Sequence, residues 1–201
     1  GGISYTLSSL KGNFTGLASG DERGRNSPNG ERFFDLWHMG WTKNLEPVDG
    51  PLPTDRTHAL KAYGSYVFKW GLTVGTVINA MSGNPVTEMW NVDTPNFLPF
   101  NRGNMGRTPF LWWTDLYAEY NLKLGDKYRL NFNVNVTNVF NTDTAQWVYW
   151  NKYISNVSPG DKALISKNWE PKPTATLDPR FGYEYNFFDP IAVRLGLKFV
   201  F

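Results

Sequence analysis

The stretch from residue 115 to residue 136, DLYAEYNLKLGDKYRLNFNVNV, decides the fold of this chain. Apolar side chains occupy the even positions from Leu116 to Leu124, and mostly polar ones occupy the odd positions between them. The same alternation resumes at Tyr128 and runs to Val136. A period of two is typical of a β-strand with one apolar and one polar face. Two such runs around the break at 125–127 therefore predict a β-hairpin.

The length of the break sets the register of this hairpin. A three-residue loop pairs Leu124 with Tyr128, and every further pair then places an apolar residue opposite another apolar residue. A two-residue loop would shift the strands by one and oppose apolar to polar side chains. The runs before and after residues 69–71 follow the same rule, with Phe68 opposite Leu72 and a glycine at the third loop position, where a left-handed residue is favoured.

Six strands of this kind are predicted, joined alternately by long and short connections. A short extra hairpin is expected inside the last long connection, because residues 180–188 are partly strand-like. Connections of several dozen residues are uncommon inside a compact domain. The expected strands cover about 3–14, 57–68, 72–82, 110–124, 128–140 and 191–201, and the long connections cover 17–55, 83–108 and 141–190.

Composition excludes several classes of protein. The chain has 201 residues, a net charge of +2 and no cysteine, which argues against a nucleic-acid partner and rules out a disulfide scaffold. No apolar run reaches the roughly 20 residues that a membrane helix needs. A membrane β-barrel remains compatible, because only alternate residues of its strands face lipid. The first residues are strand-like rather than typical of a signal peptide, so we expect a mature piece or a fragment.

The connection pattern predicts an all-β, antiparallel segment of a transmembrane β-barrel. Such barrels have short turns at one end, long extracellular loops at the other and strands of about ten residues. Six strands are fewer than the roughly eight of the smallest single-chain barrels, and free strand edges are not tolerated in lipid. The rest of the barrel must therefore come from a longer polypeptide or from partner chains. Aromatic residues mark both expected interfaces: Tyr66, Phe68, Trp70, Tyr128, Phe199 and Phe201 at the turns, and Trp112, Trp113 and Phe140 at the loops.

An aromatic-rich soluble β-sandwich is the alternative, but every regular strand also has a polar face. The apolar face is expected to meet lipid through Leu60, Tyr66, Val74, Ile78, Leu122, Phe132, Val134, Leu195 and Leu197. The opposite face is expected to line a water-filled lumen with the charged residues Lys61, Asp115, Glu119, Lys123, Arg129, Arg194 and Lys198.

Several short motifs stand along the chain in a fixed order: GPLPTDRTH (50–58), WGL (70–72), SGNP (82–85), NMGRTP (104–109) and NVFN (138–141). Their order and spacing resemble those of TonB-dependent transporters of the Oar-like branch, which carry an N-terminal carboxypeptidase-regulatory-like domain. The segment 138–141 resembles the motif that ends the penultimate strand of these transporters. The last strand, with Phe199 and Phe201, is similar to the C-terminal signal that the barrel-assembly machinery reads.

This resemblance implies a 22-stranded barrel in the outer membrane of a Gram-negative bacterium. It implies that these six strands are the last six, and that transport is driven by the TonB–ExbB–ExbD complex. The plug domain and the TonB box lie outside this sequence, so coupling to TonB rests on the resemblance alone. The implied partners are the remainder of the barrel, the plug, the assembly machinery and outer-membrane lipid.

No catalytic constellation stands out, and we expect neither an enzyme nor a cofactor. Asp35 and His38 lie in a polar loop without a third metal ligand, and His58 is expected to make a hydrogen bond at the rim. Asp115 and Glu119 could serve glycoside hydrolysis as a carboxylate pair. We favour instead ion pairs with cations on neighbouring strands, such as Lys61 or Arg129.

The loop tryptophans are the candidates for substrate contact: Trp37, Trp41, Trp90, Trp147, Trp150 and Trp169. Exposed indole rings can stack on sugars or grip a peptide, but the same rings can also pack loop against loop. Both interpretations stay open. Three functions are compatible with the sequence: active TonB-dependent transport, a passive porin-like channel, and a soluble carbohydrate-binding β-sandwich.

Overall fold

The computed structural model describes residues 1–13, 40–92, 97–125, 127–157 and 166–201 and shows an all-β chain. No helix long and apolar enough to span a membrane occurs among these residues. Eight strands are present in this part of the chain: β1 (Gly2–Leu7), β2 (His58–Val67), β3 (Leu72–Met81), β4 (Leu111–Leu124), β5 (Tyr128–Thr137), β6 (Ala145–Val148), β7 (Glu184–Phe187) and β8 (Ala192–Val200).

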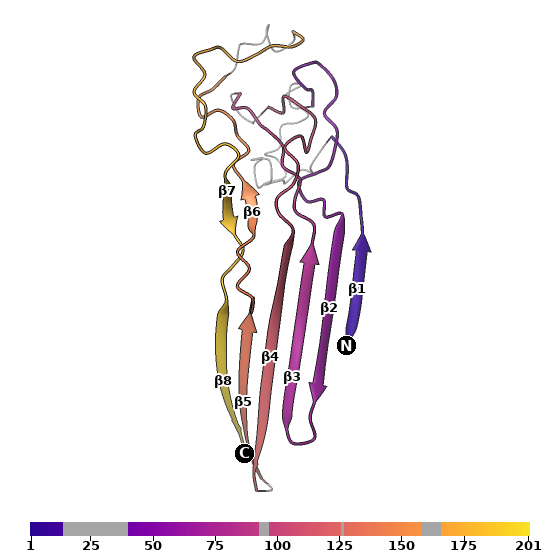
Figure 1. Ribbon diagram of the computed structural model, residues 1–201, viewed down its shortest axis with the longest axis vertical. Coiled ribbons are helices and arrows are strands. Elements are labelled where there is room, and N and C mark those ends of the chain that lie inside the picture. Colours follow the sequence, from indigo (N-terminus) through magenta and orange to yellow (C-terminus); the bar gives the residue numbers. More distant parts are fainter. Residues whose placement is uncertain (14–39, 93–96, 126, 158–165) are drawn as a thin grey trace.

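Six of these strands form one antiparallel sheet in the order β1-β2-β3-β4-β5-β8 (Figure 1). The register is the one predicted from the three-residue turns: Leu124 pairs with Tyr128, and Tyr66 pairs with Val74. Gly71 closes the turn between β2 and β3 with a φ of 101°, and its N–H donates to the carbonyl oxygen of Phe68 at 3.1 Å. The two short turns lie at one end of the sheet, and the long connections gather at the other (Figure 1).

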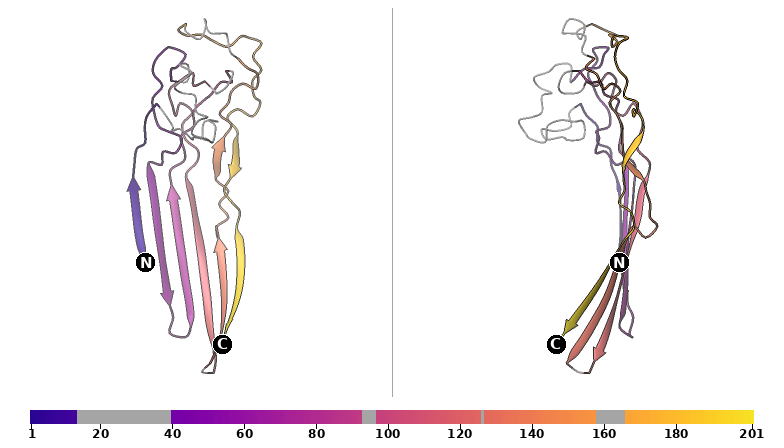
Figure 2. Two further views of the ribbon diagram at one scale, coloured as in Figure 1. Left: turned by 180° about the vertical axis from the view of Figure 1, so that it is seen from behind. Right: turned by 90° about the vertical axis from the view of Figure 1, so that its left-hand side faces the viewer.

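The sheet is a single twisted layer. Seen edge-on, β8 and β5 swing away from β2 and β3, and no second sheet of described residues covers either face (Figure 2). The register places the seven charged residues expected on the polar face together on one side, with Glu119 opposite Asn133 and Arg194 opposite Asn135. The nine residues of the expected lipid-facing set lie on the other side.

The strand ends differ from the expected ones in two places. β1 stops at Leu7 rather than near residue 14, because the N–H of Leu10 turns to the Asp55 carboxylate, at 2.6 Å, instead of to a neighbouring strand. β5 stops at Thr137 rather than at residue 140, because Asn138 takes a left-handed conformation with a φ of 50°. The extra strand pair exists, but β7 pairs with β6, from the other end of the last long connection.

The hydrophobic core lies outside the six-stranded sheet. We call the described residues of 40–57, 82–110 and 138–191 the loop layer. Ten of the eleven buried hydrophobic residues lie there, and only Leu111 belongs to the sheet. On the apolar face of the sheet, by contrast, Leu195 is 78% exposed and Leu197 is 66% exposed. Among the described residues, the hydrophobic core therefore lies in the loop layer, and the two faces of the six-stranded sheet are left open.

Aromatic residues contact one another at both ends of the strands. At the turn end, the Tyr128 and Phe199 rings are stacked with centroids 5.8 Å apart, and Phe201 continues the stack at 6.2 Å from Phe199. At the loop end, Trp112 packs against Phe140 with ring centroids 5.4 Å apart.

Candidate functional site: the loop layer and its junction with the sheet

A partly buried ion pair joins the first and second long connections directly above the sheet. The Asp55 side chain is 3% exposed and accepts from the guanidinium of Arg107. A second nitrogen of that guanidinium, Nη1, donates to the carbonyl oxygens of Asp55 and Gly83 at 3.0 and 2.9 Å. Arg107 thus holds three backbone or side-chain oxygens from two segments that are far apart in sequence.

The Asp55 carboxylate is held in its charged form despite its burial. Burial by itself raises the pKa of Asp55, but the hydrogen bond from Arg107 and the N–H of Leu10 act in the opposite direction. Together with the positive charge of Arg107 and the Thr57 hydroxyl, these donors lower the pKa below its usual value. The junction is therefore a charged site at neutral pH.

Two of the quoted motifs, residues 82–85 and 104–109, face each other across the stem of the second long connection. The N–H of Thr108 donates to the carbonyl oxygen of Asn84, and the N–H of Asn84 donates to Thr108 Oγ1, both at 2.9 Å. A Cβ added to Gly83 would lie 1.7 Å from the carbonyl oxygen of Thr108, so only glycine fits there. The stem extends the β3–β4 pair beyond the sheet and carries the loop layer above it.

A second junction forms around Asn138, which is 2% exposed at the end of β5. Its backbone N–H donates to Asp115 Oδ1 at 2.9 Å. Its side-chain amide donates to the carbonyl oxygens of Thr142 and Asp189 at 2.9 and 2.8 Å, and its Oδ1 accepts from the N–H of Thr142 at 2.9 Å. One asparagine therefore ties the end of β5 to β4 and to the chain entering β8.

Asn141 completes this junction. It has a φ of 50°, a left-handed conformation that asparagine tolerates better than most residues. Its Oδ1 accepts from the N–H of Ile191 at 2.9 Å, just before β8 begins. The geometry explains why the 138–141 motif has asparagine at both ends: each one turns the chain and satisfies backbone groups at the edge of the sheet.

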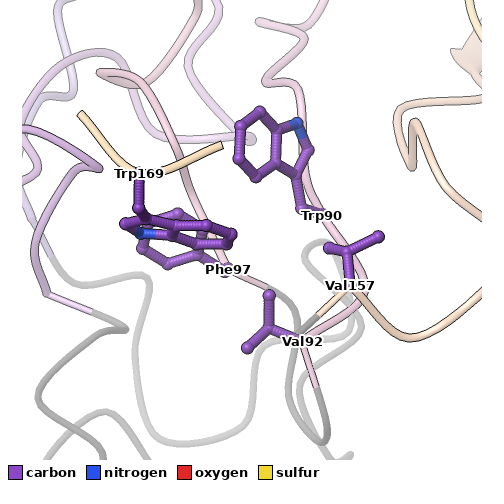
Figure 3. Packing of buried hydrophobic residues seen from close by; sticks show 5 residues of the cluster. All are labelled: Trp90, Val92, Phe97, Val157 and Trp169. Carbon is purple, nitrogen blue, oxygen red and sulfur yellow. The ribbon is translucent and has the colours of Figure 1, made fainter. Parts of the chain in front are cut away.

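Above these junctions the second and third long connections share an aromatic core. Trp90, Val92, Phe97, Val157 and Trp169 form one buried cluster (Figure 3). The Trp169 ring lies 5.4 Å from Phe97 at 34° and 5.3 Å from Trp90 at 82°, as centroid distances. Such tilted and edge-to-face pairs contribute about 0.5–1.5 kcal/mol each beyond their buried area.

Two cations tie the first long connection to this core. The ammonium of Lys43 lies 5.2 Å from the Phe100 ring centroid and pairs with Glu170. Arg102 is 4% exposed and donates through Nη2 to the carbonyl oxygen of Asn13 at 3.1 Å. Burial lowers the pKa of Arg102 to about 10, so its guanidinium stays charged at neutral pH. All three long connections thus belong to one packed unit.

The candidate tryptophans fall into three groups. Trp90 and Trp169 are 1% and 6% exposed. In this structure both rings therefore pack loop against loop and are not open to a substrate. Trp41 is 39% exposed, and Trp147 and Trp150 are half-buried beside each other with ring centroids 5.5 Å apart. Trp37 lies outside the described residues. The rings still open to a ligand in this part of the chain are those of Trp41, Trp147 and Trp150.

The charged residues proposed for chemistry make structural contacts. Asp115 accepts from the backbone of Asn138, and Glu119 accepts from the Tyr117 hydroxyl and from Asn121 Nδ2. The expected ion pairs of these carboxylates with Lys61 or Arg129 are wrong among the described residues, because nearer donors on the end of β5 and on β4 itself satisfy the oxygens.

The histidines and metal ligands add little to the site. His58 makes the expected rim hydrogen bond, with the Tyr5 hydroxyl 2.8 Å from its Nδ1. Asp35 and His38 lie outside the described residues. Within the described ranges, no three acidic, cysteine or histidine side chains come together in a group that could hold a metal ion.

Sequence patterns alone did not reveal the two junctions. Asp55 and Arg107 both lie in motifs noted above, but they are separated by 52 positions and no local pattern links them. Asn138 carried a stronger signal, because the motif repeats asparagine at a strand end, where left-handed residues are common.

The architecture, an antiparallel sheet with open faces below a packed loop layer, is matched by a distant sequence relationship to TonB-dependent transporters. The chain is 28% identical to the TonB-dependent transporter Oar of Myxococcus xanthus over 221 residues, which cover 98% of this chain. It spans only 20% of that protein's length. No protein-family model and no solved structure matches the chain.

Proposed function

We propose that this chain forms part of the wall and the extracellular loops of a TonB-dependent transporter that carries a substrate across an outer membrane. The position of its hydrophobic core carries this proposal. A soluble sheet of this size buries its apolar face, whereas here Leu195 and Leu197 stay open and the core lies in the loops. An apolar face left open beside an aromatic belt fits contact with lipid.

The polar face supports a wall around a wet lumen rather than a protein core. Four of its charged residues lie opposite asparagine on a neighbouring strand, as Lys198 does opposite Asn131 and Glu119 does opposite Asn133. The remainder of the barrel, the plug and TonB itself are assigned on the distant relationship to the TonB-dependent transporter Oar. We assign no catalytic role and no cofactor to this chain.

Accessibility of single cysteines in intact cells tests the topology. The chain has no cysteine of its own, and Lys172 in the loop layer and Lys127 in the short turn are both exposed. In the full-length protein we expect Lys172→Cys to react with a membrane-impermeant maleimide on whole cells. Lys127→Cys should react only after the outer membrane is permeabilised. Labelling of Lys127→Cys on intact cells would overturn the assignment.

A passive porin-like channel is separated from an active transporter by permeability. Vesicles that contain the full-length protein should resist swelling in small sugars if a plug closes the barrel. Rapid swelling would favour the channel instead. The soluble β-sandwich makes a different prediction: the protein would stay a monomer in buffer without detergent. Its solubility and oligomeric state in such buffer test this alternative.

A further inference from the structure

Four cations gather on the polar face of β4, β5 and β8, and we call them the basic patch: Lys123, Arg129, Arg194 and Lys198. Lys123 of β4 lies directly opposite Arg129 of β5, next to the turn. Lys198 lies two residues along β8 from the partner of Arg129, and Arg194 lies four residues further. Figure 1 shows the ends of β4, β5 and β8 side by side at the turn end. The patch therefore starts at the turn and extends along β8.

The basic patch is not neutralised within the described part of the chain. None of its four side chains forms an ion pair there, and all four residues are exposed. Glu119 interacts electrostatically with Lys198, but its oxygens already accept from the Tyr117 hydroxyl and from Asn121. Asp115, the other carboxylate on the polar face of the described strands, lies nearer the loop end. Four cations thus face one carboxylate that already has other donors.

This arrangement restricts what can cover the face. Like charges directly opposite each other destabilise a strand pair, and Lys123 and Arg129 form such a pair. Water weakens the repulsion while the face stays wet. A macromolecule that covers the face removes this water, and burying unpaired cations is strongly unfavourable. A partner seated here must therefore bring carboxylates or other anionic groups with it.

The spread of the charges selects the kind of anion. Arg194 and Lys198 are four residues apart on one strand, which is about 13 Å, so a single phosphate or carboxylate cannot reach the whole patch. A small anion on an open, exposed face is also held weakly, because water screens each ion pair. Asn131, Asn133 and Asn135 lie among the cations and offer amide groups to a peptide backbone. Several carboxylates on a polypeptide segment match this surface best.

We propose that the basic patch docks an acidic segment of the same longer polypeptide, from outside these 201 residues. The chain spans only 20% of the length of Oar, so a related full-length protein has ample further chain. A tethered segment has a high effective concentration, so individually weak ion pairs suffice to hold it. The inference rests on the proposed function, because it names what meets the polar face inside the lumen.

Carbodiimide coupling of the full-length protein in detergent tests this docking. The reagent takes up one water as it joins a lysine amine to a carboxylate in ion-pair contact, and peptide mapping by mass spectrometry locates the new amide. We expect amides from Lys123 and Lys198 to aspartate or glutamate residues outside residues 1–201. Arg194→Lys adds an amine within the patch and should add an amide to the same segment.

Charge variants separate an electrostatic contact from a merely structural one. Lys198→Gln should lower the coupling yield at Lys123 about threefold, whereas Lys198→Arg should leave that yield unchanged. The matched control is Lys61, an exposed lysine on the same face whose strand neighbours, Ser4 and Asn79, are uncharged. Lys61 should form no amide with this segment. Heat-modifiable mobility checks that every variant is folded.

Four outcomes would overturn the proposal. These are no amide from the patch, amides only to Glu119 or other residues within 1–201, amides to a different protein chain, and equal coupling at Lys61 and Lys198. The first would leave only solvent or a small soluble anion at these cations. Cysteine labelling reports on the membrane topology independently, so a failure of the docking and a failure of the proposed function are distinguishable.

Discussion

At the residue scale, Gly83 lies where two backbone segments touch. Because a Cβ would meet the carbonyl oxygen of Thr108 at 1.7 Å, Gly83→Ala should force the stem apart and destabilise the loop layer by roughly 3 kcal/mol. Gly64→Ala is the matched control, since nothing lies within 4 Å of the Cβ position there. Hydrogen exchange of residues 84–92 in the full-length protein measures the effect. Equal exchange in both variants would contradict this account of the stem.

The Asp55–Arg107 pair makes the junction sensitive to acid. The pKa of Asp55 is lowered in the folded state, so its contribution is fully present above the unfolded value of about 3.9 and is lost as the pH falls through the folded pKa. Asp55→Asn should weaken the junction by roughly 2–3 kcal/mol at pH 7, and this deficit should shrink as the pH falls below about 3.9. Exchange of the Leu10 amide, followed from pH 7 downward, measures the difference. A deficit that stayed constant with pH would contradict an ionic role.

At the scale of the element, β5 should tolerate charge on one face only. Val134 lies between Ala118 and Leu195 on the apolar face, while Asn133 lies opposite Glu119 on the polar face. Val134→Arg should be unfavourable by roughly 2–4 kcal/mol in the bilayer, and Asn133→Arg should have little effect, because Glu119 offers it a partner. The fraction of heat-modifiable, folded protein in outer-membrane preparations compares the two. Similar losses from both variants would reverse or abolish the assignment of faces.

At the scale of the whole molecule, the loop layer should open as a unit. Trp90 contacts Phe97 and Trp169, which come from two different connections. Trp90→Ala should therefore destabilise the second and third long connections together, by roughly 3–5 kcal/mol. The amides of β2 to β5 should stay protected from hydrogen exchange, because the sheet shares little of this core. Hydrogen exchange by mass spectrometry resolves the segments. Loss of protection confined to residues 84–92 would show that the connections are independent.

The existence of the six main strands, their register across both short turns and the division of side chains between two faces could all be predicted from the sequence. These features follow from local rules. Side chains alternate between the two faces along any strand, and a three-residue turn places two even-numbered or two odd-numbered residues opposite each other across the hairpin. The Phe68–Leu72 and Leu124–Tyr128 pairings needed no knowledge of the rest of the chain.

Where the strands end and which tryptophans are buried depends on tertiary contacts. β1 ends where the N–H of Leu10 donates to the Asp55 carboxylate. The second and third long connections are joined where the Trp90 ring packs against the Trp169 ring. Each of these contacts joins residues dozens of positions apart, inside connections without a periodic pattern. Their partners are chosen by packing and hydrogen bonding in three dimensions, which no local alternation encodes.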